Sequence, residues 1–426
     1  MRYAAALAIV LTAGLHAQTL DQRIDRVMPS LLTLYTTLHA APELSMREAK
    51  TSATVAQQLR DAGFTVTERV GRYQETDATC YGVVAMMKNG EGPVLLVRSD
   101  MDALPVTEQT KLPYASTGPV MHACGHDVHM TTLVGTARVL NETKSNWHGT
   151  VILVGQPAEE VVKGAQAMLR DDLYTKFPRP QYAIAIHDNS TMPAGQIGYA
   201  PGYFMASADS VNVTIRGVGG HGAAPQNTKD PIVAAAEFVL ALQTLVSREN
   251  SPLDPVVVTV GSIHGGTKRN IIPDEVTLLL TVRTYKPEVR KRVLASIERT
   301  AKGVALVAGI PADRAPIVEW LQGESTESTY NDPALTNRLA RALERDMGKS
   351  NVVQIDPLMV SEDFGRFGLD RQIPICMLNV GAVDPAKIAS GARLPSLHSS
   401  EFAPVPDPTI RGAVKAMTLA VYELLH

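Results

Sequence analysis

Apolar runs and helical patterns alternate along the first half of the chain. Residues 45–63 open with a Ser-x-x-Glu pair, carry apolar residues at helical spacing and end at Gly63, which predicts a capped helix. Short apolar runs closed by Gly, Asp or Asn are typical of buried strands; they cover residues 81–88, 93–99, 150–156 and 181–187. The pattern predicts an α/β fold in which a mixed sheet is flanked by helices.

Three of these predicted strands end on polar side chains. Asp100 and Asp102 follow the second run, Glu159 and Glu160 follow the third, and His187 ends the fourth. Because open α/β sheets bind ligands at the carboxyl edge of their strands, we expect these side chains to point to one place.

The middle of the chain has a different order of elements. Its predicted strands and helices follow the order βαββαβ, that of a ferredoxin-like module; the segments are 210–217, 230–249, 256–263, 275–283, 287–309 and 315–320. This module, assigned to residues 206–321, separates His398 from the other candidate site residues. The catalytic domain is therefore predicted to be discontinuous and to consist of residues 18–205 and 322–426.

Residues 1–17 have the pattern of a secretory signal peptide. Arg2 precedes an apolar stretch, and Ala17 stands where cleavage would follow. We expect an exported protein, periplasmic or extracellular, with an apolar N-terminal helix as the alternative. No later segment offers about 18 uninterrupted apolar residues, so a membrane span is not expected.

Composition narrows the classes of partner. Of the 426 residues, 45% are hydrophobic and 19% charged, which is a globular rather than a disordered balance. A net charge of -3 gives no basic face for nucleic acid, so a small molecule is the expected partner. Three cysteines are an odd count for an exported chain and argue against a disulfide framework. Cys80 and Cys376 fit buried small hydrophobic positions.

The densest cluster of reactive side chains is MHACGHDVHM at residues 121–130. Cys124 and His126 offer a thiolate and an imidazole, which are standard ligands for zinc and similar ions. A buried cysteine beside solvated histidines is the plain alternative. A cysteine nucleophile paired with an imidazole is another, but it leaves the acidic pair that follows unexplained.

Glu159 and Glu160 would by themselves suit a solvated turn. Next to a metal cluster, one carboxylate can bind the metal while its neighbour takes a proton from a water whose pKa the cation lowers. His187 and His398 are single histidines, and each by itself fits a turn residue as well as a ligand.

Sequence blocks along nearly the whole chain after residue 17 resemble the pattern of a known family. The chain is similar to the M20 metallopeptidases, in particular the amidohydrolase branch with hippurate hydrolase, N-acyl-amino-acid amidohydrolases and plant auxin-conjugate hydrolases. The blocks, in order, are LHAAPELSMRE, VRSDMDALPVTE, MHACGHDVHM, GTVILVGQPAEE, GGHGAAP with DPI, GGTKRNIIPDE, SEDF and LHSSEF.

The resemblance implies a role for each candidate residue. Two divalent metal ions per subunit are implied, manganese or zinc ahead of cobalt or nickel. Glu159 is the implied general base, and Asp102 is expected to orient a metal-bound imidazole. The implied metal ligands are Cys124 as a bridge, Glu160 with His398 at one ion, and His126 with His187 at the other.

The ferredoxin-like module is implied to serve as a lid and dimerisation domain. His221 would reach the active site of the partner subunit, which implies a homodimer, while Asn270 and Arg283 would contact substrate. As plain alternatives these are loop residues. Gln226 stands where this branch commonly has His, a departure from the family pattern that we interpret as a change at the rim of the substrate site.

The resulting expectation is a metal-dependent amidohydrolase. It would cleave the amide bond of small N-acyl amino acids or related short amides with metal-activated water. A dipeptidase or aminopeptidase of the same fold is the nearest alternative. A cysteine-nucleophile hydrolase and a non-catalytic binding protein are alternatives from other classes.

Overall fold

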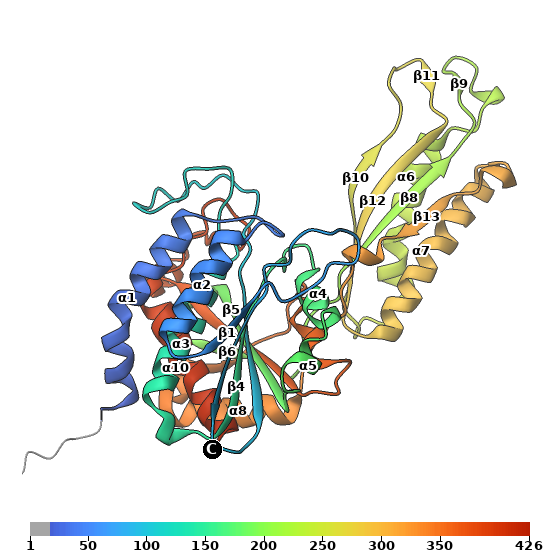
Figure 1. The fold of residues 1–426 in the computed structure, drawn as a ribbon. Helices are drawn as coiled ribbons and strands as arrows, with labels where there is room; N and C mark the ends of the chain where they lie inside the picture. Colours follow the sequence, from blue (N-terminus) through green and yellow to red (C-terminus); the bar gives the residue numbers. More distant parts are fainter. Residues whose placement is uncertain (1–17) are drawn as a thin grey trace, which may run out of the picture.

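The computed structural model describes residues 18–426, and it contains two lobes (Figure 1). The signal-peptide prediction for residues 1–17 lies outside the described residues. The larger lobe contains both ends of the described chain. The smaller lobe, residues 209–320, extends away from it and is built on a separate four-stranded sheet.

The larger lobe is built on an eight-stranded sheet with the order β1-β2-β4-β3-β5-β16-β6-β15. Its centre is parallel, since β4, β3, β5 and β16 pair in parallel, while β1, β2 and β6 add antiparallel pairings. The predicted mixed sheet is confirmed. The strands are β1 (Thr65–Glu68), β2 (Val83–Asn89), β3 (Val94–Asp100), β4 (Gly149–Gln156), β5 (Tyr182–Pro193), β6 (Ile197–Tyr199), β15 (Val352–Gln354) and β16 (Ile375–Val383).

Helices cover both faces of this sheet, as alternating side chains of its strands require. In β3, Leu95 and Val97 pack in a core with five helices, whereas Leu96 packs on the opposite face with shorter helices. The first face carries α1 (Leu20–Ala40), α2 (Ala49–Asp61), α3 (His126–Glu142), α8 (Pro333–Met347) and α10 (Pro406–Leu424). The second carries α4 (Gly164–Arg170), α5 (Leu173–Lys176) and the 3-10 helix η7 (Phe364–Gly368).

The smaller lobe has the βαββαβ order that the sequence predicts. Its antiparallel sheet has the order β10-β12-β8-β13, and alternate residues of the strands form a core with two helices. The elements are β8 (Asp209–Arg216), α6 (Pro231–Thr244), β10 (Val256–His264), β12 (Glu275–Thr284), α7 (Pro287–Val307) and β13 (Ile317–Trp320). Short elements complete the chain: β7 (Gly202–Met205), β9 (Gly220–His221), β11 (Ile271–Ile272), β14 (Thr329–Asn331) and α9 (Pro385–Ala389).

Two predicted boundaries are wrong, each because a tertiary contact replaces a local one. The helix predicted from Ser45 begins at Ala49, and the Ser45 hydroxyl donates to Asp102 (2.6 Å) instead of capping it. The strand predicted to end at His187 continues to Pro193, because β16 pairs with it beyond His187.

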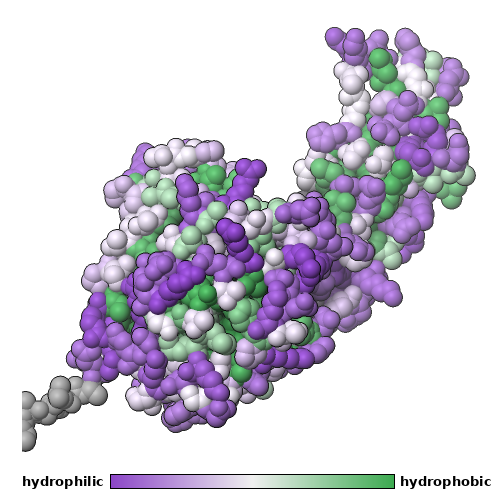
Figure 2. Space-filling view, viewed as in Figure 1, coloured by the Kyte–Doolittle hydropathy of each residue, from purple (hydrophilic) through white to green (hydrophobic). Residues whose placement is uncertain are grey.

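Helix α6 has an unusually apolar outer face. Within residues 18–426, the segment Pro231–Glu249 alone is long and apolar enough to cross a membrane by length and composition, with a mean hydropathy of 1.3. Its inner residues Ala234, Phe238 and Leu242 pack in the core of the smaller lobe. Ile232, Val233 and Leu240 are exposed, and Figure 2 shows hydrophobic residues exposed among hydrophilic ones on this lobe. A partly buried core helix accounts for the segment.

Candidate metal centre and active site

A sharp turn brings the predicted thiol and imidazole to the carboxyl edge of the sheet. Gly125, between Cys124 and His126, has a φ of 81° at the N-terminus of α3. A Cβ atom at this position would lie 2.4 Å from the Asp188 carboxylate, so the turn requires glycine.

One group of metal-binding atoms comes from three distant segments. Donor atoms of Cys124, Glu160 and His398 lie within 4.8 Å of one another. The His398 Nε2 atom is 3.5 Å from Glu160 Oε2. His398 has a φ of 66°, and its backbone N–H donates to the Ala123 carbonyl (2.8 Å), which fixes the C-terminal segment beside the Cys124 turn.

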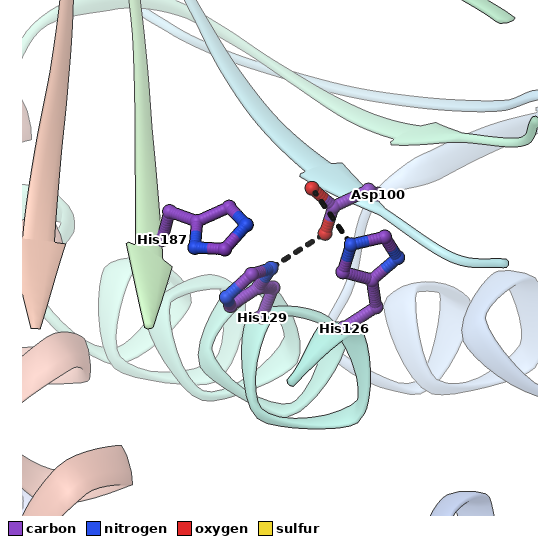
Figure 3. A group of neighbouring side chains, drawn as sticks. All are labelled: Asp100, His126, His129 and His187. Atoms are coloured by element: carbon purple, nitrogen blue, oxygen red, sulfur yellow. Dashed lines mark hydrogen bonds and ion pairs between the residues drawn. The ribbon is translucent and has the colours of Figure 1, made fainter. Parts of the chain in front are cut away.

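A second group adjoins the first. Figure 3 shows Asp100 at the end of β3, His126 and His129 on α3 and His187 on β5 around one space, and their donor atoms lie within 4.8 Å of one another. The Cys124 Sγ atom is 3.6 Å from His187 Nε2, so the thiol lies between the two groups. All five predicted metal ligands are therefore brought together.

His129 holds the second group in place. Its Nδ1–H donates to Asp100 Oδ1 (2.6 Å), and its Nε2 accepts the backbone N–H of Asp188 (2.9 Å). With both ring nitrogens bonded, His129 orients Asp100 rather than offering a free lone pair. His129 stands in the same motif as His126, but nothing in the local sequence distinguishes it from that predicted ligand.

Asp102 connects the imidazole to the acidic pair. Its carboxylate accepts the backbone N–H groups of Glu159 (3.1 Å) and Glu160 (3.0 Å), and its carbonyl oxygen lies 2.7 Å from His126 Nδ1. The Nε2 atom of His126 is thereby turned toward Glu160 Oε1, at 3.8 Å. Asp102 thus contacts both the His126 ring, which the sequence predicted it to orient, and the turn that carries the acidic pair.

The site concentrates buried negative charge. Burial, and then the charges of Glu362 and Glu160, raise the pKa of Glu159 well above its usual range. Burial raises the pKa of Glu160 to about 7. Burial and the neighbouring carboxylates also raise the pKa of the Cys124 thiol, the opposite of what a cysteine nucleophile needs.

Divalent cations fit this arrangement. Among the described residues, His126 Nε2, Glu160 Oε1 and both Asp188 carboxylate oxygens are buried without a hydrogen-bond partner. Unpaired buried polar atoms are costly, and a thiolate, imidazoles and carboxylates are donors that zinc and similar ions accept. The residues suit two metal ions.

A buried arginine forms hydrogen bonds with acidic residues at the site. Arg98, on β3, forms a bidentate pair with Glu362 (2.7 and 3.1 Å) and also donates to Asp100 (2.6 Å). Carboxylate oxygens of Glu159, Glu362 and Asp363 form a further group, in which they lie within 4.8 Å of one another. These two acids belong to the SEDF block, for which the sequence alone suggested no role.

The comparison with protein families decides the classification. The model of peptidase family M20/M25/M40 matches residues 96–398. The chain belongs to this family.

Proteins from other organisms match most of the length of this chain. The chain is 37% identical to hippurate hydrolase of Campylobacter jejuni, over 78% of this chain and 82% of that protein. It is 35% identical to N-acetylcysteine deacetylase of Bacillus subtilis, over 74% and 79%. A solved dinuclear metal-binding M20 peptidase of Bacillus subtilis superposes with a TM-score of 0.77 at 28% identity, over 94% of this chain and 99% of that one.

The three remaining predicted residues do not all lie beside the candidate metal ligands of the same chain. His221 is exposed on β9, and Asn270 is exposed in the turn just before β11; these two short strands pair at the far end of the smaller lobe (Figure 1). Arg283 lies at the opposite end of that lobe's sheet, where it donates to Ser361 (2.6 Å), one residue before Glu362. Within one chain, only Arg283 is near the site.

Proposed function

We propose that this M20 protein is a metal-dependent amidohydrolase that cleaves small N-acyl amino acids. The observation that carries the proposal is the meeting of five candidate metal ligands from four segments of the chain beside the carboxylate of Glu159. The names of two relatives, hippurate hydrolase and N-acetylcysteine deacetylase, support an N-acyl amino acid as the substrate class. We favour manganese or zinc as the metal.

The chain's own residues divide the work of hydrolysis. When bound, the two ions supply Lewis acidity and lower the pKa of water. Glu159 takes a proton from the attacking water and returns it to the leaving amine. Asp102 holds the Glu159 turn and the His126 ring. Arg283 is proposed to bind a substrate carboxylate, which its position beside Ser361 supports.

Metal removal tests this function. We expect cleavage of N-acetyl and N-benzoyl amino acids to stop after chelation and to return when manganese or zinc is added, measured by release of the free amino acid. Unchanged activity in metal-free protein would contradict the proposal. Cleavage restricted to dipeptides with a free amine would instead favour a dipeptidase of the same fold.

We further propose a homodimer through the smaller lobe. β10 is an edge strand of its sheet, with no second neighbour among residues 18–426, and the apolar outer face of α6 lies on the same lobe. Exposed edge strands and apolar patches of this kind are typical protein interfaces. Such a dimer would allow His221 and Asn270, exposed at the far end of the lobe, to complete the partner's active site.

A charge on α6 tests the dimer. Leu240 is 72% exposed, and we expect Leu240→Glu to give a monomer in sedimentation velocity, with a loss of kcat. Leu306, 80% exposed at the end of α7, provides a matched control. Leu306→Glu is expected to stay dimeric and active; identical sedimentation of both variants would remove support for this interface.

A further inference from the structure

The turn that carries the acidic pair is strained. Ala158, directly before Glu159, has a φ of 53°, and Val162, two residues after Glu160, has a φ of 51°. Residues with a Cβ rarely adopt this left-handed conformation, and a β-branched one is a clear outlier. Strain of this kind persists only where surrounding contacts enforce it.

Buried carboxylates supply these contacts along the turn. Glu48 Oε1 accepts the N–H of Ala158 (2.9 Å), and Asp102 accepts the next two backbone N–H groups. Asp363 accepts the N–H of Ala165 (3.0 Å), at the start of α4. The strained residue before the base is therefore held by Glu48, a residue that the functional reading of the sequence left without a role.

Glu48 is fully buried and lies outside the groups of metal-binding atoms. It occupies the N-cap position of α2, yet its side chain makes no capping hydrogen bond to that helix. Glu43 caps the helix instead, accepting from the N–H groups of Lys50 (2.9 Å) and Thr51 (2.8 Å). The Glu48 Oε1 atom also accepts the backbone N–H of Met46 (2.8 Å), so it joins the segment before α2 to the turn and does not cap α2.

We propose that Glu48 is a positioning residue for the active site: through Ala158 it fixes the strained turn that aims Glu159 at the substrate and Glu160 at the metal. This inference rests on the proposed function for Glu159 and Glu160. It depends on the reach of the side chain and on an acceptor oxygen at Oε1, rather than on the charge. Glutamine can replace Glu48, whereas the shorter aspartate cannot.

Two variants separate reach from charge. We expect Glu48→Asp to lower kcat and to weaken metal binding, each by about 10- to 100-fold, the usual effect of losing a residue that orients a ligand, with KM little changed. Metal affinity is measured by calorimetric titration of manganese into the metal-free protein. Glu48→Gln retains the acceptor and is expected to stay within about threefold of the unmodified protein in kcat and metal affinity.

Glu43→Asp is the matched control, because it shortens a carboxylate of the same segment that does not contact the turn. It is expected to lower thermal stability without changing kcat or metal affinity. In a Glu48→Asp background, Ala158→Gly is expected to restore part of the lost kcat, because glycine adopts the left-handed conformation without strain.

Two results would overturn the proposal for Glu48. The first is normal kcat and metal affinity in Glu48→Asp, and the second is an equal loss of both in Glu43→Asp. If the unmodified protein cleaves no N-acyl amino acid, the proposed function fails, but the metal titration of the same variants still tests the role of Glu48. The two proposals therefore fail in distinguishable ways.

Discussion

Replacement of Glu159 by glutamine is expected to lower kcat by about 10²- to 10⁴-fold, the range of a lost general acid-base group. The amide has nearly the same shape but cannot accept the proton of the attacking water. Asp102 bonds the backbone of residue 159 and not its side chain, so the turn should keep its geometry. Initial rates with an N-acyl amino acid, together with metal content by mass spectrometry, measure the effect.

The exposed residue Glu91, in the turn between β2 and β3, provides the control for Glu159. Glu91→Gln should leave kcat unchanged. A near-normal rate in Glu159→Gln would rule out this carboxylate as the base. Loss of metal along with activity would instead show that Glu159 is a metal ligand.

The largest expected effect on stability is at Arg98. Replacing this fully buried arginine with methionine leaves the carboxylates of Asp100, Glu362 and Asp363 without their shared cation. Breaking a buried charge network by removing one partner costs about 3–5 kcal/mol of unfolding free energy. Urea denaturation of the metal-loaded protein, monitored by circular dichroism, measures the loss.

A surface pair gives the comparison for Arg98. Arg60 forms an ion pair with Glu68, in which both side chains are more than a third exposed, and such pairs contribute about 0–1 kcal/mol. Arg60→Met should therefore change the unfolding free energy far less than Arg98→Met. Equal effects would mean that the acids around Arg98 are stabilised without its charge, for example by taking up protons.

Much of the fold was readable from local patterns. Apolar runs of strand length predicted β2, β3, β4 and β10 to within two residues, and the hydrophobic patterns of successive segments predicted the βαββαβ order of the smaller lobe. Hydrophobic periodicity is a property of the local sequence, so it can be recognised without knowing which elements pack against each other. The signal peptide at residues 1–17 stays a prediction from the sequence.

The candidate site was only partly readable. Cys124 with His126, and Glu159 with Glu160, stand close together in the chain, so each pair carries a signal by itself. His187 and His398 are isolated in the sequence: the end of a predicted strand pointed to His187, whereas only the resemblance to the M20 family gave either histidine a role as a metal ligand. The structure brings them to the other donors through β5 and the segment beside Ala123.

The sequence by itself determined the class of fold, the family and the chemical types at the metal centre. Only the tertiary structure decided which polar residues support them: Ser45 and Glu48 look like a helix cap but bond Asp102 and Ala158, and Arg98 meets Glu362 across 264 positions of chain. A buried polar side chain must satisfy its hydrogen bonds with whatever the fold places beside it. The spacing of residues along the chain does not show which residue that neighbour will be.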